Sequence, residues 1–291
     1  MKAWKLLPEK RQQKLFDLVD RGKQARAYVD AASRILFPPG ARQHRLPGRL
    51  VVSLTSYPRR FAHLRWTLEC LLSQSVSADD IILWIAEADR AALPANVTRL
   101  QEQGLSIRVC ADLHSYKKII PTLTEYPDAF IVTADDDVYY DSDWLQTLEA
   151  EALANPGVVI AHRVHQIRLD AAGMPRPYEE WERDPERRGA AWDIFPTGIG
   201  GVLYPPGAFA APIDDASLFQ TLCPHGDDIW LFWMTRMQGM QAKGCTGPAR
   251  WQDWAGTGEG ALWLENRAGR NDANIQNMLA HFGWPQDMSC R

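Results

Sequence analysis

The chain has 291 residues, 46% of them hydrophobic and 23% charged, which is typical of a soluble globular protein with one large domain, with or without an appendage. The net charge of −4 is unevenly spread: residues 1–49 hold 12 lysines and arginines against 4 aspartates and glutamates, and the remainder holds 20 against 32. An acidic body argues against nucleic acid as the main partner. Five cysteines without a CxxC pair, and an N-terminus without a signal-peptide apolar stretch, predict a cytoplasmic protein.

The basic N-terminal segment is predicted to be a helical arm. Residues 1–37 have helical character, and FPPGARQHRLPG (37–48) interrupts it with prolines and glycines. We therefore expect an arm and linker over 1–47 and a domain over 48–291, with the arm separable from the domain. The arm's charge would suit an anionic membrane surface, which would make the protein peripheral to a membrane. An ordinary solvated helical face would carry the same charges.

Strand-like and helical segments alternate after the linker. Strands are predicted for RLVVSLTSY (49–57), DIILWIA (80–86), LSIRVC (105–110) and AFIVTA (129–134), which are rich in β-branched residues. Helices are predicted over 61–74, 97–103 and 117–126, and from Ser142, which can cap the helix that follows it. This alternation predicts an α/β fold: a mostly parallel central sheet flanked by helices, with ligands at the carboxyl ends of the strands.

Three consecutive carboxylates, Asp135, Asp136 and Asp137, follow the last of these strands. Extended backbone would point Asp135 and Asp137 to one side and Asp136 to the other. Two carboxylates on one side can hold Mn²⁺ or Mg²⁺ through oxygen ligands, and such an ion commonly also binds substrate phosphates. The alternative is a cluster that only shapes the turn and caps the next helix.

Four blocks of sequence together resemble bacterial glycosyltransferases with the A-type nucleotide-sugar fold, and most closely the family-2-like and capsule or lipopolysaccharide transferases. The blocks are VVSLTSYPRRFAHLRWTLECLLSQSVSADDIILWIA, YKKIIPTLTEYPDAFIVTADDDVYY, GIGGVLYPPG and HGDDIWL, and the resemblance covers about residues 49–282. It implies a Rossmann-like nucleotide-sugar domain with a donor half over about 48–140 and an acceptor half over about 141–291.

The resemblance also implies the residues of the donor site. A metal held by Asp135 and Asp137 would bridge the two donor phosphates and neutralise charge on the leaving nucleoside diphosphate. The residues implied to contact the nucleotide or its phosphates are Thr55, Ser56, Tyr57, Arg59 or Arg60, Lys117, Lys118 and Asp136. The carboxylate that usually follows the second strand falls one or two places late here, at Glu87, which leaves base recognition open.

On the acceptor side, Gly200 and Gly201 would allow close approach of a ligand, or would only form a tight turn. Asp227 and Asp228 begin an apolar helix, where carboxylates are favoured in any case. The resemblance implies that Asp228, as an exposed carboxylate with a pKa near 4, is the general base, and that Asp227 binds acceptor or supports the loop.

The four histidines considered for the site are less specific signals. His225 and His281 are candidates for a third metal ligand, and His162 and His165 for the acceptor side, although a solvated or buried structural role is expected for each. We therefore predict a metal-dependent, inverting transfer of sugar from a nucleotide-sugar donor to a glycan or lipid-linked acceptor in cell-surface polysaccharide synthesis.

Two other classes of function use similar residues. A nucleotidyl- or phosphoryl-transfer enzyme could use the same metal site, although the phosphate loop GxxxxGK[ST] is absent from the sequence. A non-catalytic nucleotide-sugar-binding module could keep the fold, but the intact DDD and GDDIW segments argue against it.

Overall fold

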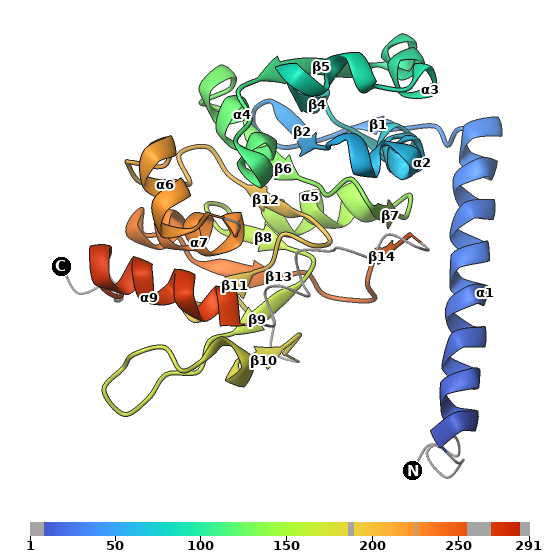
Figure 1. Cartoon of the computed structure of the whole chain (residues 1–291). Coiled ribbons are helices and arrows are strands. Elements are labelled where there is room, and N and C mark those ends of the chain that lie inside the picture. The colour runs from blue at the N-terminus through green and yellow to red at the C-terminus, as the bar shows by residue number, and fades with distance from the viewer. Residues whose placement is uncertain (1–8, 186–188, 225, 255–268, 286–291) are drawn as a thin grey trace.

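A central sheet of seven strands organises the computed structural model, which describes residues 9–185, 189–224, 226–254 and 269–285, with side chains from residue 19 onward (Figure 1). In spatial order the strands are β13 (Ala242–Gly244), β8 (Val159–Ala161), β12 (Val202–Tyr204), β6 (Phe130–Thr133), β2 (Leu50–Thr55), β4 (Asp80–Ala86) and β5 (Leu105–Cys110). Neighbouring strands are parallel except around β12, which is antiparallel to both β6 and β8. The predicted α/β fold with a mostly parallel sheet is confirmed.

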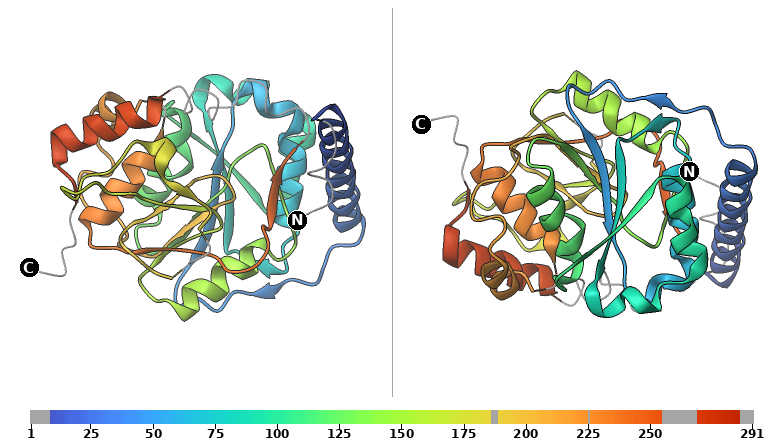
Figure 2. Two further views of the ribbon diagram at one scale, coloured as in Figure 1. Left: turned by 90° about the horizontal axis from the view of Figure 1, so that it is seen from below. Right: turned by 90° about the horizontal axis from the view of Figure 1, so that it is seen from above.

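Helices cover both faces of this sheet, as the two views of Figure 2 show. Successive side chains of a strand point to opposite faces, so Val51 packs into one core and Val52 into the other. Helices α4, α6, α7 and α9 belong to the first core, and α1, α2 and α5 to the second. The helices are α1 (Glu9–Leu36), α2 (Phe61–Leu72), α3 (Ala95–Thr98), α4 (Ile120–Glu125), α5 (Trp144–Ala154), α6 (Ala216–Leu222), α7 (Asp227–Met237) and α9 (Asn271–Phe282).

Three expected helices differ in detail from the structure. The segment 97–103 divides between α3 and the 3₁₀ helix η4 (Arg99–Gln103), and the segment 117–126 divides between η5 (His114–Lys118) and α4. Pro121 lies in the first turn of α4. Because proline has no N–H, it cannot continue the hydrogen bonds of the preceding turn, but it is well tolerated at the start of a new helix. Ser142 does not cap α5, which begins at Trp144, because the Asp141 side chain accepts a hydrogen bond from Asp143 N at 3.0 Å and forms a turn there.

Smaller sheets and short 3₁₀ helices flank the central sheet. Strand β7 (Val138–Tyr140), directly after the three aspartates, pairs antiparallel with β14 (Trp251–Asp253). The remaining elements are β1 (Arg42–Gln43), β3 (Val76–Ser77), β9 (Val164–Gln166), β10 (Glu182–Arg183), β11 (Ile194–Pro196), η2 (Pro58–Arg60), η3 (Glu87–Ala92) and η6 (Tyr178–Glu180).

The C-terminal half of α1 packs closely on the domain. Ala31 is 1% exposed, and the side chain of Arg34 is 6% exposed. Arg34 Nη2 donates to the Tyr140 carbonyl at 2.8 Å, and Arg34 Nε lies 2.8 Å from Asp30 Oδ2. The same carboxylate accepts a hydrogen bond of 2.8 Å from the Tyr139 hydroxyl. This inner face of α1 therefore contacts β7 directly after the aspartates.

The linker after α1 is also fixed to the domain. Strand β1 pairs with β3, and the fully buried Glu149 accepts hydrogen bonds from Arg42 Nη1 at 3.0 Å and from Arg45 N at 2.6 Å. The boundary at residue 48 stays a prediction, but these contacts argue against an arm that can be removed without loss of stability. No helix among the described residues combines the length and apolar character needed to cross a membrane.

The substitution Arg34→Met should lower the free energy of unfolding by about 2 kcal/mol, because it removes the charged donor to the Tyr140 carbonyl while keeping much of the side-chain volume. Lys23→Met is the matched control, since the Lys23 side chain is 63% exposed. Chemical denaturation of both variants measures the difference. Equal stability of the two variants would show that the inner face of α1 contributes little to the fold.

Candidate active site

The acidic turn, Asp135–Asp137, lies at the carboxyl end of β6, beside the segment that follows the parallel strand β2. Ser56, directly after β2, donates from Oγ to Asp136 Oδ2 at 2.5 Å. Asp135 N donates to the Tyr140 hydroxyl at 2.8 Å, which closes the turn onto β7. Burial raises the pKa of Asp136 to about 6, against the opposing effects of Arg60 and Ser56. Asp136 is thus held inside the turn.

Arg60, at the end of η2, neutralises part of the negative charge of the acidic turn. Its guanidinium forms an ion pair with Asp137 and lies 3.7 Å from Asp136 Oδ1. Arg59, the alternative named from the sequence, is exposed. Of these two arginines it is therefore Arg60 that reaches the turn, and a phosphate contact by Arg59 stays a prediction.

Thr55, Tyr57 and Lys117 were also expected to contact the nucleotide, and the structure shows what surrounds each of them. Thr55 Oγ1 donates to the Trp84 carbonyl at 2.8 Å and so ties the ends of β2 and β4 together. Tyr57 is 39% exposed. Lys117 is buried and forms an ion pair with Asp112. Contacts of Thr55, Tyr57 and Lys117 with a nucleotide stay predictions.

Lys118 joins two acidic segments that are far apart in the sequence. Its Nζ lies 3.1 Å from Asp135 Oδ1 and 3.1 Å from Asp227 Oδ2, and its side chain is 8% exposed. Burial by itself would lower the pKa of Lys118, but the carboxylates of Asp135, Asp227 and Asp228 raise it well above its ordinary value. The neighbouring carboxylates therefore favour the charged ammonium of Lys118 between the acidic turn and the start of α7.

Asp228, the second residue of α7, lies against Gly198. A Cβ added to Gly198 would lie 2.7 Å from Asp228 Oδ1 and 3.2 Å from Lys118 Nζ, so glycine leaves the room that both groups need. Burial, and then the adjacent Asp227 carboxylate, raise the pKa of Asp228 to about 7, against the Lys118 ammonium and a hydrogen bond from the Gly198 backbone. The expectation of an exposed carboxylate with a pKa near 4 is wrong, because Asp228 is partly buried beside another carboxylate.

Asp135 and Asp137 offer a donor set that fits Mn²⁺ or Mg²⁺. Their side chains are 24% and 19% exposed, and each has one oxygen paired with a protein cation. The other oxygen of each makes no hydrogen bond or ion pair with a described residue. Two carboxylates suffice when substrate phosphates and water complete the coordination. Within the described ranges no group of three or more His, Cys, Asp or Glu side chains could hold a metal ion, so the structure offers no cage made by the protein alone.

Gly200 and Gly201, expected to lie near an acceptor, are packed against tryptophans. A Cβ on Gly201 would lie 2.6 Å from Trp144 Cζ2, and one on Gly200 would overlap the Trp251 indole. Both glycines have φ values in the left-handed region, 88° and 98°, which other residues rarely adopt. Packing and backbone conformation thus explain both glycines, and their contact with an acceptor stays a prediction.

His162 and His165 are buried in the structure. His162 Nε2 lies 3.0 Å from the Trp144 carbonyl. His165 is 2% exposed, and burial, followed by the Arg163 charge, lowers its pKa to about 4. Both histidines therefore have the structural surroundings that the sequence favoured for them.

The remaining candidates from the sequence lie outside this arrangement or outside the described part. His281 is exposed on α9 and packs on Phe282, with ring centroids 4.5 Å apart. Glu87 is exposed at the start of η3. His225 falls outside the described residues. A third metal ligand at His225 or His281, and base recognition by Glu87, stay predictions.

Two residues of this region were not expected from the sequence, Gly198 and Asp253. Asp253 ends β14 opposite Val138, and burial, followed by the Asp135 carboxylate, raises its pKa. Gly198 stands in PTGIGG, two residues before the glycines that were singled out. Neither position carried a clear signal, because both depend on contacts between segments that are distant in the sequence.

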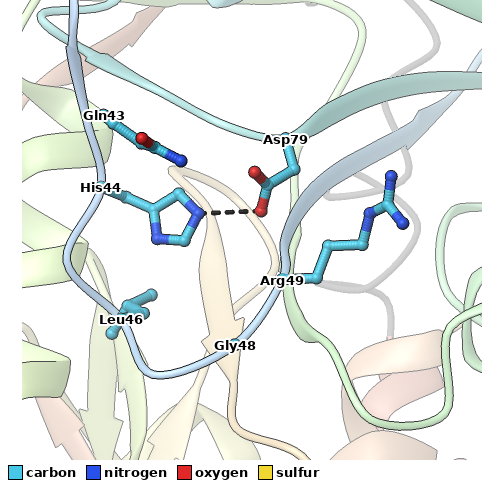
Figure 3. Close-up of a pocket in the computed structure, with 6 residues that line it drawn as sticks. All are labelled: Gln43, His44, Leu46, Gly48, Arg49 and Asp79. Carbon is cyan, nitrogen blue, oxygen red and sulfur yellow. Dashed lines mark hydrogen bonds and ion pairs between the residues drawn. The ribbon is translucent and has the colours of Figure 1, made fainter.

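A separate pocket lies at the opposite end of the strands from the acidic turn, at the amino ends of β2 and β4 (Figure 3). Its polar groups already contact one another or their neighbours: His44 Nε2 lies 2.8 Å from Asp79 Oδ2, and Arg49 Nε donates to Asp80 Oδ2 at 2.9 Å. The acidic turn and this pocket therefore occupy opposite ends of the strands, and the pocket takes no part in the candidate site.

Comparisons with known proteins find a likeness only at the level of solved structures. No protein-family model and no curated protein matches the chain. Residues 1–349 of TarS from S. aureus superpose with a TM-score of 0.46 at 12% identity, covering 79% of this chain and 65% of that one, so this chain spans less than two thirds of that structure.

Two further solved structures resemble the chain over a similar extent. The inositol-1-phosphate CTP transferase from T. maritima has a TM-score of 0.40 at 9% identity, over 84% of this chain and 99% of that one. The enzyme 4-diphosphocytidyl-2C-methyl-D-erythritol synthase has a TM-score of 0.45 at 11% identity, over 78% and 99%. Likenesses at this level assign no family, and the function is therefore inferred from the residues of the site.

Titration of Asp228 in the metal-free protein should show a midpoint near the raised pKa of about 7, and Asp227→Asn should move that midpoint to lower pH. The reason is that the substitution removes the adjacent negative charge, which disfavours ionisation of Asp228. Carboxyl ¹³C NMR measures the midpoint, and Asp214→Asn, at an exposed position, is the control. A wild-type midpoint near 4 would mean that the Asp228 carboxylate is solvated.

Proposed function

We propose that this protein is a metal-dependent glycosyltransferase that moves a sugar from a nucleotide-sugar donor to a hydroxyl of a glycan or lipid-linked acceptor. The observation that carries the proposal is the position of Lys118, which lies 3.1 Å from a carboxylate of the acidic turn and 3.1 Å from one at the start of α7. The α7 carboxylate is Asp227, and the neighbouring Asp228, the candidate base, faces Lys118 across Gly198. Carboxylates suited to a metal and a carboxylate suited to a base therefore lie together near the carboxyl end of β6. Cell-surface polysaccharide synthesis at the inner face of a membrane is the setting that the family resemblance suggests.

The donor's diphosphate would be bound by groups around the acidic turn. Asp135 and Asp137 would hold Mn²⁺ or Mg²⁺, and the ion, when bound, supplies charge neutralisation for the leaving nucleoside diphosphate. Arg60 and Lys118 pair with these same carboxylates. As fixed cations beside the turn, they can exchange a carboxylate partner for a phosphate oxygen of the donor.

Asp228 would act as the general base. The acceptor hydroxyl oxygen attacks the anomeric carbon, the bond from that carbon to the diphosphate oxygen breaks, and the electron pair leaves with the nucleoside diphosphate. The hydroxyl proton passes to the Asp228 carboxylate. A base with a pKa of about 7 suits proton transfer near neutral pH. Such a single displacement inverts the anomeric configuration.

The arrangement supports sugar transfer over the two alternatives. In nucleotidyl transfer to a sugar phosphate, the attacking phosphate oxygen is already ionised and needs no base, whereas a sugar hydroxyl does. A non-catalytic binding module would not need Asp228 held against Gly198 beside a second carboxylate. Product analysis separates the reactions, because sugar transfer releases a nucleoside diphosphate and nucleotidyl transfer releases pyrophosphate.

Metal-dependent donor binding should be lost in Asp137→Ala. A thermal-shift series with nucleoside diphosphates should show Mn²⁺-dependent stabilisation of the wild-type protein by the correct nucleotide, since ligands that bind only the folded state stabilise it. Asp214→Ala, at an exposed position, should keep that response. Retention of the Mn²⁺-dependent shift by Asp137→Ala would show that the metal is held elsewhere.

Turnover should fall by about 10²–10⁴-fold in Asp228→Asn, with little change in the dissociation constant of the nucleotide, because only the basic group is lost. The wild-type rate should rise with pH through about 7, since Asp228 is protonated below that value.

Gly198→Ala should slow turnover by on the order of a hundredfold, because its methyl group would displace the Asp228 carboxylate. Gly40→Ala, where an added Cβ has open space, is the control.

Normal turnover of the Asp228→Asn variant would place the base elsewhere. Product stereochemistry, measured by NMR, would then distinguish inversion from retention.

A further inference from the structure

Helix α1 has an outer face that does not pack on the domain. Val29 and Leu36 are 69% and 72% exposed, and Phe37, directly after the helix, is 77% exposed. At helical spacing, Val29 and Leu36 lie on the side opposite to Ala27 and Ala31, which are buried in the domain. Figure 2 views α1 nearly end-on at one edge of the molecule, with the domain on one side of it only.

Large apolar side chains are unusually concentrated on this helix. Of the six large hydrophobic residues exposed in the described part of the chain, Val19, Val29 and Leu36 lie on α1 and Phe37 follows it directly. Single exposed apolar residues are ordinary on protein surfaces, but a group along one helix marks a contact surface. The helix therefore has an inner face that binds the domain and an outer face available to a partner.

The charges around the outer face indicate the chemistry of that partner. Arg21 and Arg26 are exposed on the same helix and flank this face at helical spacing. The first 49 residues hold 12 lysines and arginines against 4 aspartates and glutamates, although the rest of the chain is acidic. Exposed apolar side chains flanked by basic ones suit contact with an anionic membrane surface.

We propose that the outer face of α1 docks on an anionic lipid bilayer. The helix would lie in the plane of the interface, with Val29, Leu36 and Phe37 entering the headgroup region and Arg21 and Arg26 contacting lipid phosphates. Face-to-face docking of two copies is disfavoured, because their positively charged arms would repel each other. The proposal does not depend on the reaction at the acidic turn.

Docking would also have a consequence for the candidate site. Arg34 and Asp30 of the same helix bind Tyr140 and Tyr139, which follow the acidic turn directly. A bilayer bound to the outer face of α1 would thus lie on the far side of the helix from β7, and the site would be held near the membrane surface. This is where a lipid-linked acceptor would be found.

Vesicle sedimentation of the full-length chain tests the proposal. The protein should sediment with vesicles of phosphatidylcholine and phosphatidylglycerol, not with phosphatidylcholine alone, and the binding should weaken as salt is added. The double variant Arg21→Glu with Arg26→Glu should lower the partition coefficient by at least about tenfold. Leu36→Ser with Phe37→Ser should also lower it, because the apolar insertion is lost.

Matched substitutions on other surfaces provide the controls. Arg90→Glu with Arg99→Glu changes the net charge by the same amount at exposed positions of η3 and η4, and Leu169→Ser removes an exposed leucine outside α1. All these variants should keep the wild-type circular dichroism spectrum, and the controls should keep vesicle binding. Failure of the wild-type protein to bind anionic vesicles would overturn the proposal, as would equal loss of binding in the control variants. Light scattering that shows a dimer abolished by the two α1 variants would make a second copy the occupant and would equally overturn it.

Discussion

The Lys118 ammonium, with its side chain 8% exposed, lies among the carboxylates of Asp135, Asp227 and Asp228. A buried charge is strongly unfavourable unless it is paired, and three neighbouring carboxylates repel one another unless a cation lies between them. The lysine and the aspartates therefore depend on each other. Because Asp135 follows β6 and Asp227 begins α7, this electrostatic cluster also fixes the position of α7 relative to the central sheet. Burial, together with repulsion from the Asp227 carboxylate, keeps the pKa of Asp228 high enough for a base that works near neutral pH.

Close packing holds the loop on the other side of the cluster. Trp144 Nε1 donates to the Gly200 carbonyl at 2.6 Å, and the Trp144 ring packs on Tyr140 with centroids 4.4 Å apart. The Tyr140 hydroxyl in turn accepts the Asp135 backbone N–H. The loop that contains Gly198, Gly200 and Gly201 therefore packs together with the acidic turn as one unit. Glycine is required in this loop because an indole ring or a carboxylate occupies the space that a Cβ would need.

Helix α1 reaches the same unit from outside. Its inner face carries small alanines, which let the helix approach the domain, and Arg34, which binds the Tyr140 carbonyl. Its outer face carries large apolar and basic side chains. The two faces of α1 therefore differ in composition. The inner face packs on the domain and satisfies a buried backbone carbonyl, whereas the outer face remains in solvent and is available to a charged surface.

The sequence by itself determined the main elements of the fold. Apolar runs such as that around Val51 and Val52 predict strands buried on both faces, which in turn predict a parallel sheet covered by helices. It also determined that three aspartates lie at the end of such a strand, since this depends only on local order along the chain. Only the tertiary structure decided that Lys118 and Arg60, and not their neighbours Lys117 and Arg59, contact those aspartates. It also decided that Asp228 is partly buried with a pKa of about 7 and that Gly198 makes room for it. These properties depend on burial and on charges brought together from distant segments, and neither is encoded in the spacing of residues along the chain.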